Sequence, residues 1–159
     1  MLPVVAAQVS VVGSGGEWEG PAEEVGRLLA ERGCVVITGG LDEVMAAAHR
    51  GAKAAGGTTI AILPGESPDA ASPWADHVVV TGIGHARNLA VAASGDALIA
   101  VGGSYGTIAE MAFALRLGRR VVALEGAPAV DGAIRASTPA EAVERALQDL
   151  DPPGRRPGG

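Results

Sequence analysis

The sequence ALIAVGGSYGTIAE, from Ala97 to Glu110, joins an apolar run to a glycine cluster and then to a helical pattern. The run Ala97–Val101 is typical of a buried strand, and the glycines after it are typical of a tight turn. From Thr107 to Leu117 the apolar residues recur on one face of a helix. The stretch therefore predicts one strand–turn–helix unit of a parallel sheet.

The same alternation of short apolar runs and helical patterns extends over most of the chain. Strands are predicted at Val4–Val12, Val35–Thr38, Thr58–Leu63, His77–Thr81, Ala97–Val101 and Val121–Leu124, with a short one near Ala133–Ala136. Helices are predicted at Pro21–Arg32, Asp42–Ala55, His85–Ser94, Thr107–Leu117 and Pro139–Leu150. We therefore predict a single Rossmann-like α/β domain over residues 1–150, a doubly wound parallel sheet in a three-layer α/β/α arrangement. Residues 151–159, which are mostly proline, glycine and arginine, are expected to form a disordered tail.

Composition excludes several classes of protein. The chain has 159 residues and a formal net charge of -6, which disfavours binding to a nucleic-acid backbone. The sequence contains no run of about 20 apolar residues, so no membrane span is predicted. The single Cys34 permits no internal disulfide and fits a reducing, cytoplasmic compartment. His49, His77 and His85 are dispersed without cysteine partners, so no metal site is predicted, and only His85 is expected near a ligand.

Glycine clusters follow five of the predicted strands. They are Gly13-Ser14-Gly15-Gly16, Thr38-Gly39-Gly40, Pro64-Gly65, Gly82-Ile83-Gly84 and Gly102-Gly103-Ser104-Tyr105-Gly106-Thr107. In a parallel sheet these turns share the carboxyl edge, where helix N-termini favour an anion such as phosphate. Each cluster taken alone is explained equally well by a tight turn, and it is their number at one edge that indicates a binding site.

Two common nucleotide-binding motifs are absent from the sequence. A dinucleotide fingerprint requires a third glycine where this chain has Trp18, and an acidic residue at the end of the second strand, where it has Thr38. A P-loop requires a Gly-Lys-Ser/Thr sequence, and the only lysine is Lys53.

The sequence resembles the Lonely guy (LOG) and DprA/Smf-related Rossmann-like superfamily. It is most similar to a small bacterial branch of uncharacterised proteins often labelled "possible lysine decarboxylase". The matching segments are Ile37–Gly40 with Val44-Met45, Gly51–Gly57, Ile62–Gly65, Ala86–Asn88 and Ala100–Glu110. A lysine decarboxylase would hold pyridoxal phosphate on a lysine, and Lys53 lies well inside a predicted helix, so we do not expect that activity.

The resemblance implies roles for particular residues. In Lonely guy enzymes a P-G-G-x-G-T-x-x-E loop and an upstream arginine bind a nucleoside 5′-monophosphate and hydrolyse its N-glycosidic bond. The resemblance therefore implies Arg87 and Glu110 as catalytic residues. It implies ligand or phosphate contacts for Gly102, Gly103, Gly106 and Thr107. The glycine clusters at the carboxyl edge add Gly13, Ser14, Gly39, Gly40, Ser104 and Tyr105 as candidate contacts, and Asn88 is a further candidate beside Arg87.

Three positions depart from the enzymes' pattern. Val101 stands where the enzymes have proline, and Asn88 stands where they have lysine after the arginine. Gly39-Gly40 is followed by Leu41-Asp42-Glu43. The two carboxylates would cap a helix and repel a phosphate placed against the same turn.

Several site residues have a structural interpretation beside the functional one. Thr107 and Glu110 have the spacing of a helix capping box, so Glu110 is either a cap, a ligand-orienting or catalytic group, or both. Arg87 is either a ligand contact or a solvated surface residue, and Asn88 either binds ligand or holds its turn. Lys53 is expected to be a solvated helix residue.

These observations leave three functional hypotheses. The first is a protein that binds a small phosphorylated, nucleotide-type ligand and hydrolyses nucleoside 5′-monophosphates. The alternatives are a non-catalytic carrier of a phosphorylated cofactor, such as the molybdopterin-type molybdenum cofactor, and a nucleotide sensor or DNA-processing accessory. No cofactor is expected to be required, and a bound nucleotide or molybdopterin-type ligand is the expected occupant of the site. The resemblance also implies a homodimer or homotetramer, with Met45, Met111 and Phe113 as interface candidates.

Overall fold

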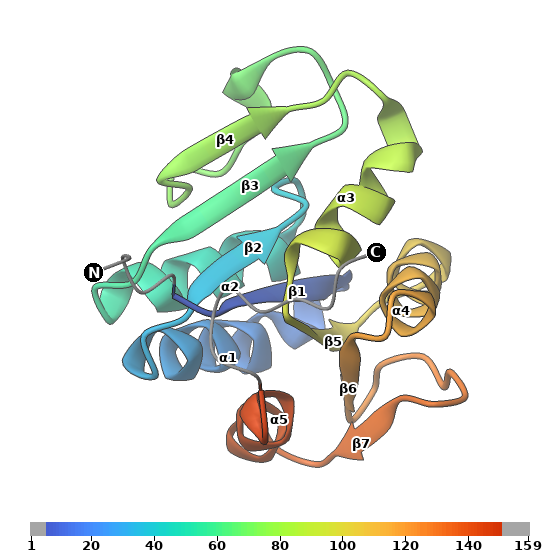
Figure 1. Cartoon of the computed structure of the whole chain (residues 1–159). Coiled ribbons are helices and arrows are strands. Elements are labelled where there is room, and N and C mark those ends of the chain that lie inside the picture. Colours follow the sequence, from blue (N-terminus) through green and yellow to red (C-terminus); the bar gives the residue numbers. More distant parts are fainter. Residues whose placement is uncertain (1–5, 151–159) are drawn as a thin grey trace, which may run out of the picture.

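The computed structural model describes residues 6–150, which form one seven-stranded parallel sheet (Figure 1). Its spatial order is β4-β3-β2-β1-β5-β6-β7. The strands are β1 Gln8–Ser14, β2 Val35–Thr38, β3 Thr59–Leu63, β4 His77–Val80, β5 Ala97–Gly102, β6 Arg120–Leu124 and β7 Ile134–Ala136. The chain builds outward from β1 to β4, returns to pair β5 with β1, and then builds outward on the other side. The prediction of a doubly wound parallel sheet is confirmed.

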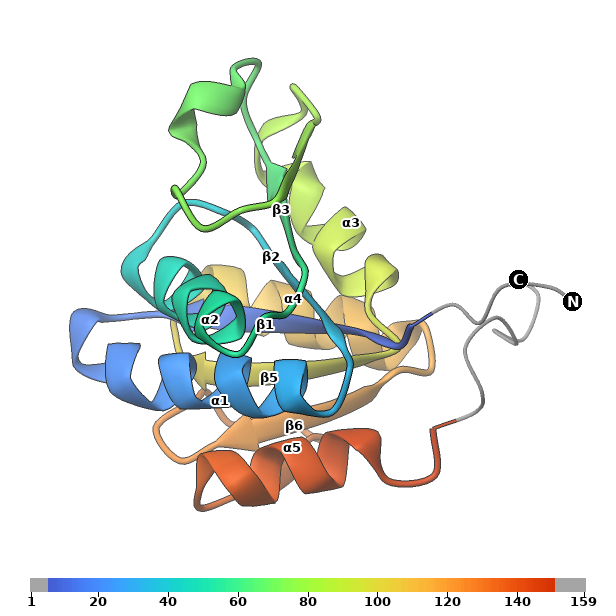
Figure 2. The ribbon, with the colours of Figure 1, turned by 90° about the vertical axis from the view of Figure 1, so that its left-hand side faces the viewer.

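Five α-helices cover the two faces of the sheet. They are α1 Glu19–Glu31, α2 Glu43–Ala54, α3 Arg87–Ser94, α4 Tyr105–Arg116 and α5 Pro139–Leu147. Helices α1, α2 and α5 lie on one face, and α3 and α4 lie on the other (Figures 1 and 2). Each face has its own apolar cluster, and strand β5, buried along its whole length, separates the two. The three-layer arrangement is therefore also confirmed.

Most predicted elements are present, with shifted ends. Strand β1 continues to Ser14, two residues further than predicted, because Gly13 and Ser14 still pair with Val101 and Gly102 of β5. Helix α4 begins at Tyr105 and not at Thr107. The predicted tail at 151–159 and the predicted strand residues before Ala6 lie outside the described part of the chain. Among the helices of residues 6–150, none is long and apolar enough to cross a membrane.

Helices α1 and α2 pack through glycine at two points of close approach. A Cβ atom on Gly26 of α1 would lie 1.9 Å from the carbonyl oxygen of Ala48 in α2. A Cβ atom on Gly51 of α2 would lie 1.9 Å from the carbonyl oxygen of Glu23 in α1. Two helix backbones can approach this closely only where side chains are missing. The pair of glycines therefore sets the spacing of the helices that cover β1 and β2.

This spacing gives a stability prediction. Alanine stabilises a helix by about 1 kcal/mol relative to glycine, but a methyl group on Gly26 would collide with the backbone of α2. We expect Gly26→Ala to lower the free energy of unfolding by about 2 kcal/mol, as in overpacked cores. The matched control is Gly20→Ala in the same helix, where no atom lies within 4 Å of the added Cβ. Urea denaturation should show the control unchanged or stabilised, and equal effects of the two substitutions would contradict the packing argument.

Candidate functional site

The site is built where β1 and β5 end side by side. The parallel register places Ser14 beside Gly102 at the carboxyl edge of the sheet. Gly13 has a φ of +144°, and a Cβ atom there would lie 1.8 Å from the carbonyl oxygen of Val101. Only glycine allows the two strand ends to come this close. The loops after β1 and β5 therefore form one continuous surface beside the start of α4.

The first turn of α4 is organised by Ser104 and Thr107. Ser104 is the N-cap residue, and its backbone N–H donates to Oγ1 of Thr107 at 3.3 Å. Gly103 packs against Thr107, because a Cβ atom on this glycine would lie 2.2 Å from Oγ1 of Thr107. The predicted capping box of Thr107 with Glu110 is wrong, since Ser104 occupies the N-cap position and Glu110 lies one turn further along the helix. Glu110 is thus free of a capping role.

Arg87 is the first residue of α3 and is buried, with 7% of its surface exposed. Its guanidinium donates through Nη2 to the carbonyl oxygen of Gly39 at 3.3 Å and through Nη1 to Oδ1 of Asn88. A Cβ atom on Gly39 would lie 2.9 Å from Cζ of Arg87, so this glycine makes room for the guanidinium. The interpretation of Arg87 as a solvated surface arginine is therefore wrong.

Arg87 and Glu110 form a buried pair that is incompletely compensated. Nη1 of Arg87 lies 3.7 Å from Oε1 of Glu110, and this oxygen accepts no hydrogen bond within the described chain. Burial raises the pKa of Glu110 to about 7, although the nearby Arg87 opposes the rise. Burial also lowers the pKa of Arg87, against the opposing charges of Glu110 and Asp42. The desolvation of both groups thus outweighs their mutual attraction.

Asp42 adds a second carboxylate at the edge of this pair. It is the N-cap residue of α2, where its Oδ1 accepts a hydrogen bond from the N–H of Met45 at 3.1 Å. Burial raises the pKa of Asp42, and hydrogen bonds from the α2 backbone oppose the rise. The predicted helix-capping role of Asp42 is confirmed. Asp42 and Arg87 line the same cavity, so an anion bound near Arg87 would also lie near this carboxylate, which would repel it.

These groups surround a cavity of about 160 Å³, hereafter the Arg87 cavity. Its lining contains eight residues that the sequence analysis selected as site residues: Gly13, Ser14, Arg87, Asn88, Ser104, Gly106, Thr107 and Glu110. The lining also contains His85, the histidine expected near a ligand, together with Asp42 and Met45. Neither Asp42 nor Met45 was predicted from the sequence to be a ligand-binding residue. The predicted juxtaposition of the β1 loop, α3 and α4 is present.

The other five selected residues do not line the Arg87 cavity. Gly39 contacts the guanidinium of Arg87, and Gly40 packs closely on Ala61 and Leu63. Gly102 lies against the indole of Trp18, and Gly103 lies against Thr107. Tyr105 is 88% exposed. Gly39 and Gly103 thus pack against two residues that line the cavity, Arg87 and Thr107, while a direct contact of any selected residue with a ligand stays a prediction.

Lys53 lies elsewhere and is not simply solvated. Its Nζ is 2.8 Å from a carboxylate oxygen of Asp76 and donates to the carbonyl oxygen of Gly57 at 3.0 Å. These contacts tie the end of α2 to the start of β4. Across residues 6–150 no group of three or more histidine, cysteine, aspartate or glutamate side chains is arranged to hold a metal ion.

Comparison with known proteins identifies a family. The model of the SLOG cluster4 family matches residues 6–150. A functionally uncharacterised protein of Archaeoglobus fulgidus is 46% identical over 139 residues, which are 86% of this chain and 91% of that protein. The match agrees with the superfamily expected from the sequence.

Two solved structures are similar in both fold and sequence. The molybdenum cofactor binding protein of the phototrophic bacterium Rippkaea orientalis superposes with a TM-score of 0.82 at 32% identity, covering 88% of this chain and 94% of that one. The molybdenum cofactor carrier protein of Chlamydomonas reinhardtii superposes with a TM-score of 0.79 at 35% identity, covering 87% and 94%. Their similarity extends over most of the chain.

The raised pKa of Glu110 gives a signed prediction for stability. The folded pKa of about 7 lies above the ordinary value of 4.5, so the stabilising contribution of Glu110 is fully present below pH 4.5 and is lost as the pH rises through 7. Glutamine cannot ionise. As the pH rises from about 4.5 to about 8, we therefore expect the wild type to lose about 3 kcal/mol of unfolding free energy that Glu110→Gln keeps.

Urea denaturation at a series of pH values measures this difference. The buried His49, whose pKa burial lowers to about 4, contributes stability that is lost as the pH falls from 6.5 through 4. That contribution is common to both proteins and cancels. Glu66→Gln on an exposed loop controls for the amide substitution itself. If the difference in unfolding free energy between Glu110→Gln and wild type did not change with pH, the raised pKa of the buried Glu110 carboxyl group would be contradicted.

Proposed function

Because the chain belongs to the SLOG cluster4 family, we propose that it binds a small phosphorylated ligand in the Arg87 cavity and carries it without chemical change. The ligand class that fits best is a molybdenum cofactor of the molybdopterin type. The proposal is supported by two similar proteins of known structure, which are described as a molybdenum cofactor binding protein and a molybdenum cofactor carrier protein. Both exceed 30% identity over nearly all of the domain.

The observation that carries the proposal is the meeting of Arg87 with the first turn of α4 in one cavity. The first N–H groups of a helix have no carbonyl partner within the helix and favour an anion. Arg87 adds a fixed guanidinium, and Ser104 and Thr107 add hydroxyl groups. A phosphate monoester matches this set of donors. At about 160 Å³ the cavity is smaller than the roughly 300 Å³ or more of pockets that enclose whole ligands, so it suits the phosphate alone.

Two features favour a carrier over a hydrolase. Asn88 stands where the resemblance to the enzymes predicts a lysine, so the site has one cation fewer. The Oδ1 atom of Asn88 accepts a hydrogen bond from Arg87, which directs this amide oxygen toward the arginine. A site with weaker charge stabilisation would still hold a phosphate, but it would stabilise a departing base or a developing charge less well.

The second candidate function is hydrolysis of the N-glycosidic bond of nucleoside 5′-monophosphates. Glu110 favours it, because a carboxyl group with a pKa of about 7 is suited to proton transfer near neutral pH. In this mechanism Thr107 and the α4 turn would hold the 5′-phosphate, and Glu110 would orient the attacking water or stabilise the positive charge on the ribose.

The expected homodimer or homotetramer also stays a prediction. Met111 is fully buried in the core of its own subunit and Met45 is nearly so, and neither presents a surface to a partner. Phe113 is 39% exposed on α4, near Leu117, which is 43% exposed. Of the three residues proposed for an interface, only Phe113 is placed to contribute.

A binding and turnover experiment separates the two candidate functions. We expect molybdopterin to bind, measured by calorimetry, with affinity reduced about tenfold or more in Arg87→Lys, because lysine loses the planar, forked geometry of the guanidinium. Arg116→Lys on the exposed end of α4 is the matched control and should bind like wild type. Glu110→Gln should retain binding.

The same preparations should release no free base from a panel of nucleoside 5′-monophosphates. If wild type released free base and Glu110→Gln did not, the carrier proposal would be rejected and hydrolysis would be the function. Absence of binding by every phosphorylated ligand, with all variants folded, would contradict both candidates.

A further inference from the structure

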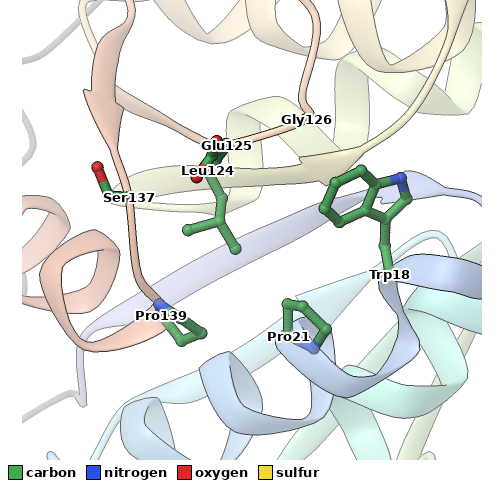
Figure 3. A pocket seen from close by; sticks show the side chains of 7 residues that line it. All are labelled: Trp18, Pro21, Leu124, Glu125, Gly126, Ser137 and Pro139. Carbon is green, nitrogen blue, oxygen red and sulfur yellow. The ribbon is translucent and has the colours of Figure 1, made fainter.

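A second and larger pocket lies at the same edge of the sheet, on the face covered by α1 and α5 (Figure 3). It has a volume of about 450 Å³, which is within the range of pockets that enclose small ligands. The lining residues come from the segment around the start of α1, from the end of β6 and the turn after it, and from the segment that joins β7 to α5. We call it the Trp18 pocket, after the indole that forms one side of it in Figure 3.

The indole of Trp18 packs between the end of β5 and the turn after β6. A Cβ atom on Gly102 would lie 2.2 Å from Cδ1 of Trp18, and one on Gly126 would lie 2.1 Å from its Cη2. Both glycines have positive φ values, +59° and +93°, so they are positions that favour glycine in any case. The aromatic wall is therefore present before any ligand arrives, which lowers the entropic cost of binding.

The rest of the pocket is apolar with a polar margin. The side chains of Leu124, Pro21 and Pro139 surround the same hollow as the indole (Figure 3). Proline rings have little conformational freedom, so they form rigid apolar walls beside the flat face of the indole. Such walls fit a planar ring system better than a flexible chain.

The polar groups of the pocket favour a hydrogen-bond donor and not an anion. Glu125 supplies the only ionisable side chain among the lining residues. The start of α5 is already capped, since Glu141 donates its N–H to Oγ1 of Thr138 at 3.1 Å and accepts from the N–H of Ser137 at 2.9 Å. The Trp18 pocket thus lacks the cationic side chain that marks the Arg87 cavity.

We infer that the Trp18 pocket is a second binding site, for a planar heteroaromatic ring whose edge carries adjacent N–H donors. The 2-amino-4-oxopyrimidine edge of guanine or of a pterin has this chemistry. The ring stacks on the indole of Trp18 while the carboxylate of Glu125, an acceptor with two oxygens, receives the two N–H groups. The inference goes beyond the proposed function, because it requires neither the phosphate nor Arg87.

The test uses probes that lack phosphate. The chain contains two tryptophans, Trp18 and Trp74, so Trp74→Phe leaves Trp18 as the source of the single indole N–H signal in the NMR spectrum of tryptophan-labelled protein. Guanosine and 6-methylpterin are titrated separately to about 1 mM, a concentration that detects weak ring binding. We expect at least one of them to shift the Trp18 signal until the site is saturated. The probe that binds more tightly shows whether the site prefers a guanine or a pterin ring.

Two comparisons make the result specific. Adenosine, which lacks the paired N–H edge, should bind at least about tenfold more weakly than the preferred probe. Glu125→Gln should weaken the preferred probe about 10- to 100-fold, because one accepting oxygen becomes a donor, while Glu66→Gln on an exposed loop should not. Arg87→Lys should leave ring binding unchanged even where it abolishes phosphate-ligand binding, so the two proposals fail independently.

Several outcomes would overturn the inference. One is the absence of a saturable shift with either probe. Another is equal affinity for adenosine, and a third is unchanged affinity in Glu125→Gln. Binding that disappears in Arg87→Lys but persists in Glu125→Gln would place the ring in the Arg87 cavity instead.

Discussion

The carboxyl edge of the sheet depends on the close approach of the ends of β1 and β5. Gly13 lies so near the carbonyl of Val101 that no side chain fits between them, and the register sets Ser14 beside Gly102. One consequence is that the loop after β5 meets the loop after β1 on both faces of the sheet. On the α3–α4 face this junction forms the Arg87 cavity, and on the α1–α5 face Gly102 supports the indole of Trp18. A side chain at Gly13 or Gly102 would therefore disturb both pockets together.

The buried charges of the Arg87 cavity are held by backbone geometry more than by each other. Arg87 reaches a carbonyl oxygen through the space that Gly39 leaves free, while its distance to Glu110 is 3.7 Å. Leaving such a pair incompletely compensated costs stability, which natural sites accept where a ligand supplies the missing partner. A phosphate would pair with Arg87 and would raise the pKa of Glu110 further, since like charges oppose ionisation. Proton uptake by Glu110 would then offset the repulsion between ligand and carboxylate.

The sequence predicted the layers, the parallel sheet and most residues of the Arg87 cavity. It succeeded because glycine turns after parallel strands must share one edge, and because the loop before Glu110 resembles a known motif. The role of Gly39 could not be predicted, because it depends on a contact with Arg87, 48 residues away in the chain. The capping box was assigned wrongly because a Thr-x-x-Glu spacing does not specify which residue begins the helix, and Ser104 provides the cap three residues earlier.

Trp18 illustrates what a motif comparison overlooks. In the sequence it was only the residue that breaks the dinucleotide fingerprint, whose third glycine lets a helix pack closely on its strand. In the fold, the large side chain replaces that close packing: it is wedged between Gly102 and Gly126 and opens a pocket beside it. The two glycines that contact Trp18 lie more than 80 residues later in the chain, so no local pattern could reveal them. Under the two proposals, the carboxyl edge binds a phosphate on one face of the sheet and a flat ring on the other, in place of the pyrophosphate that the dinucleotide fingerprint holds.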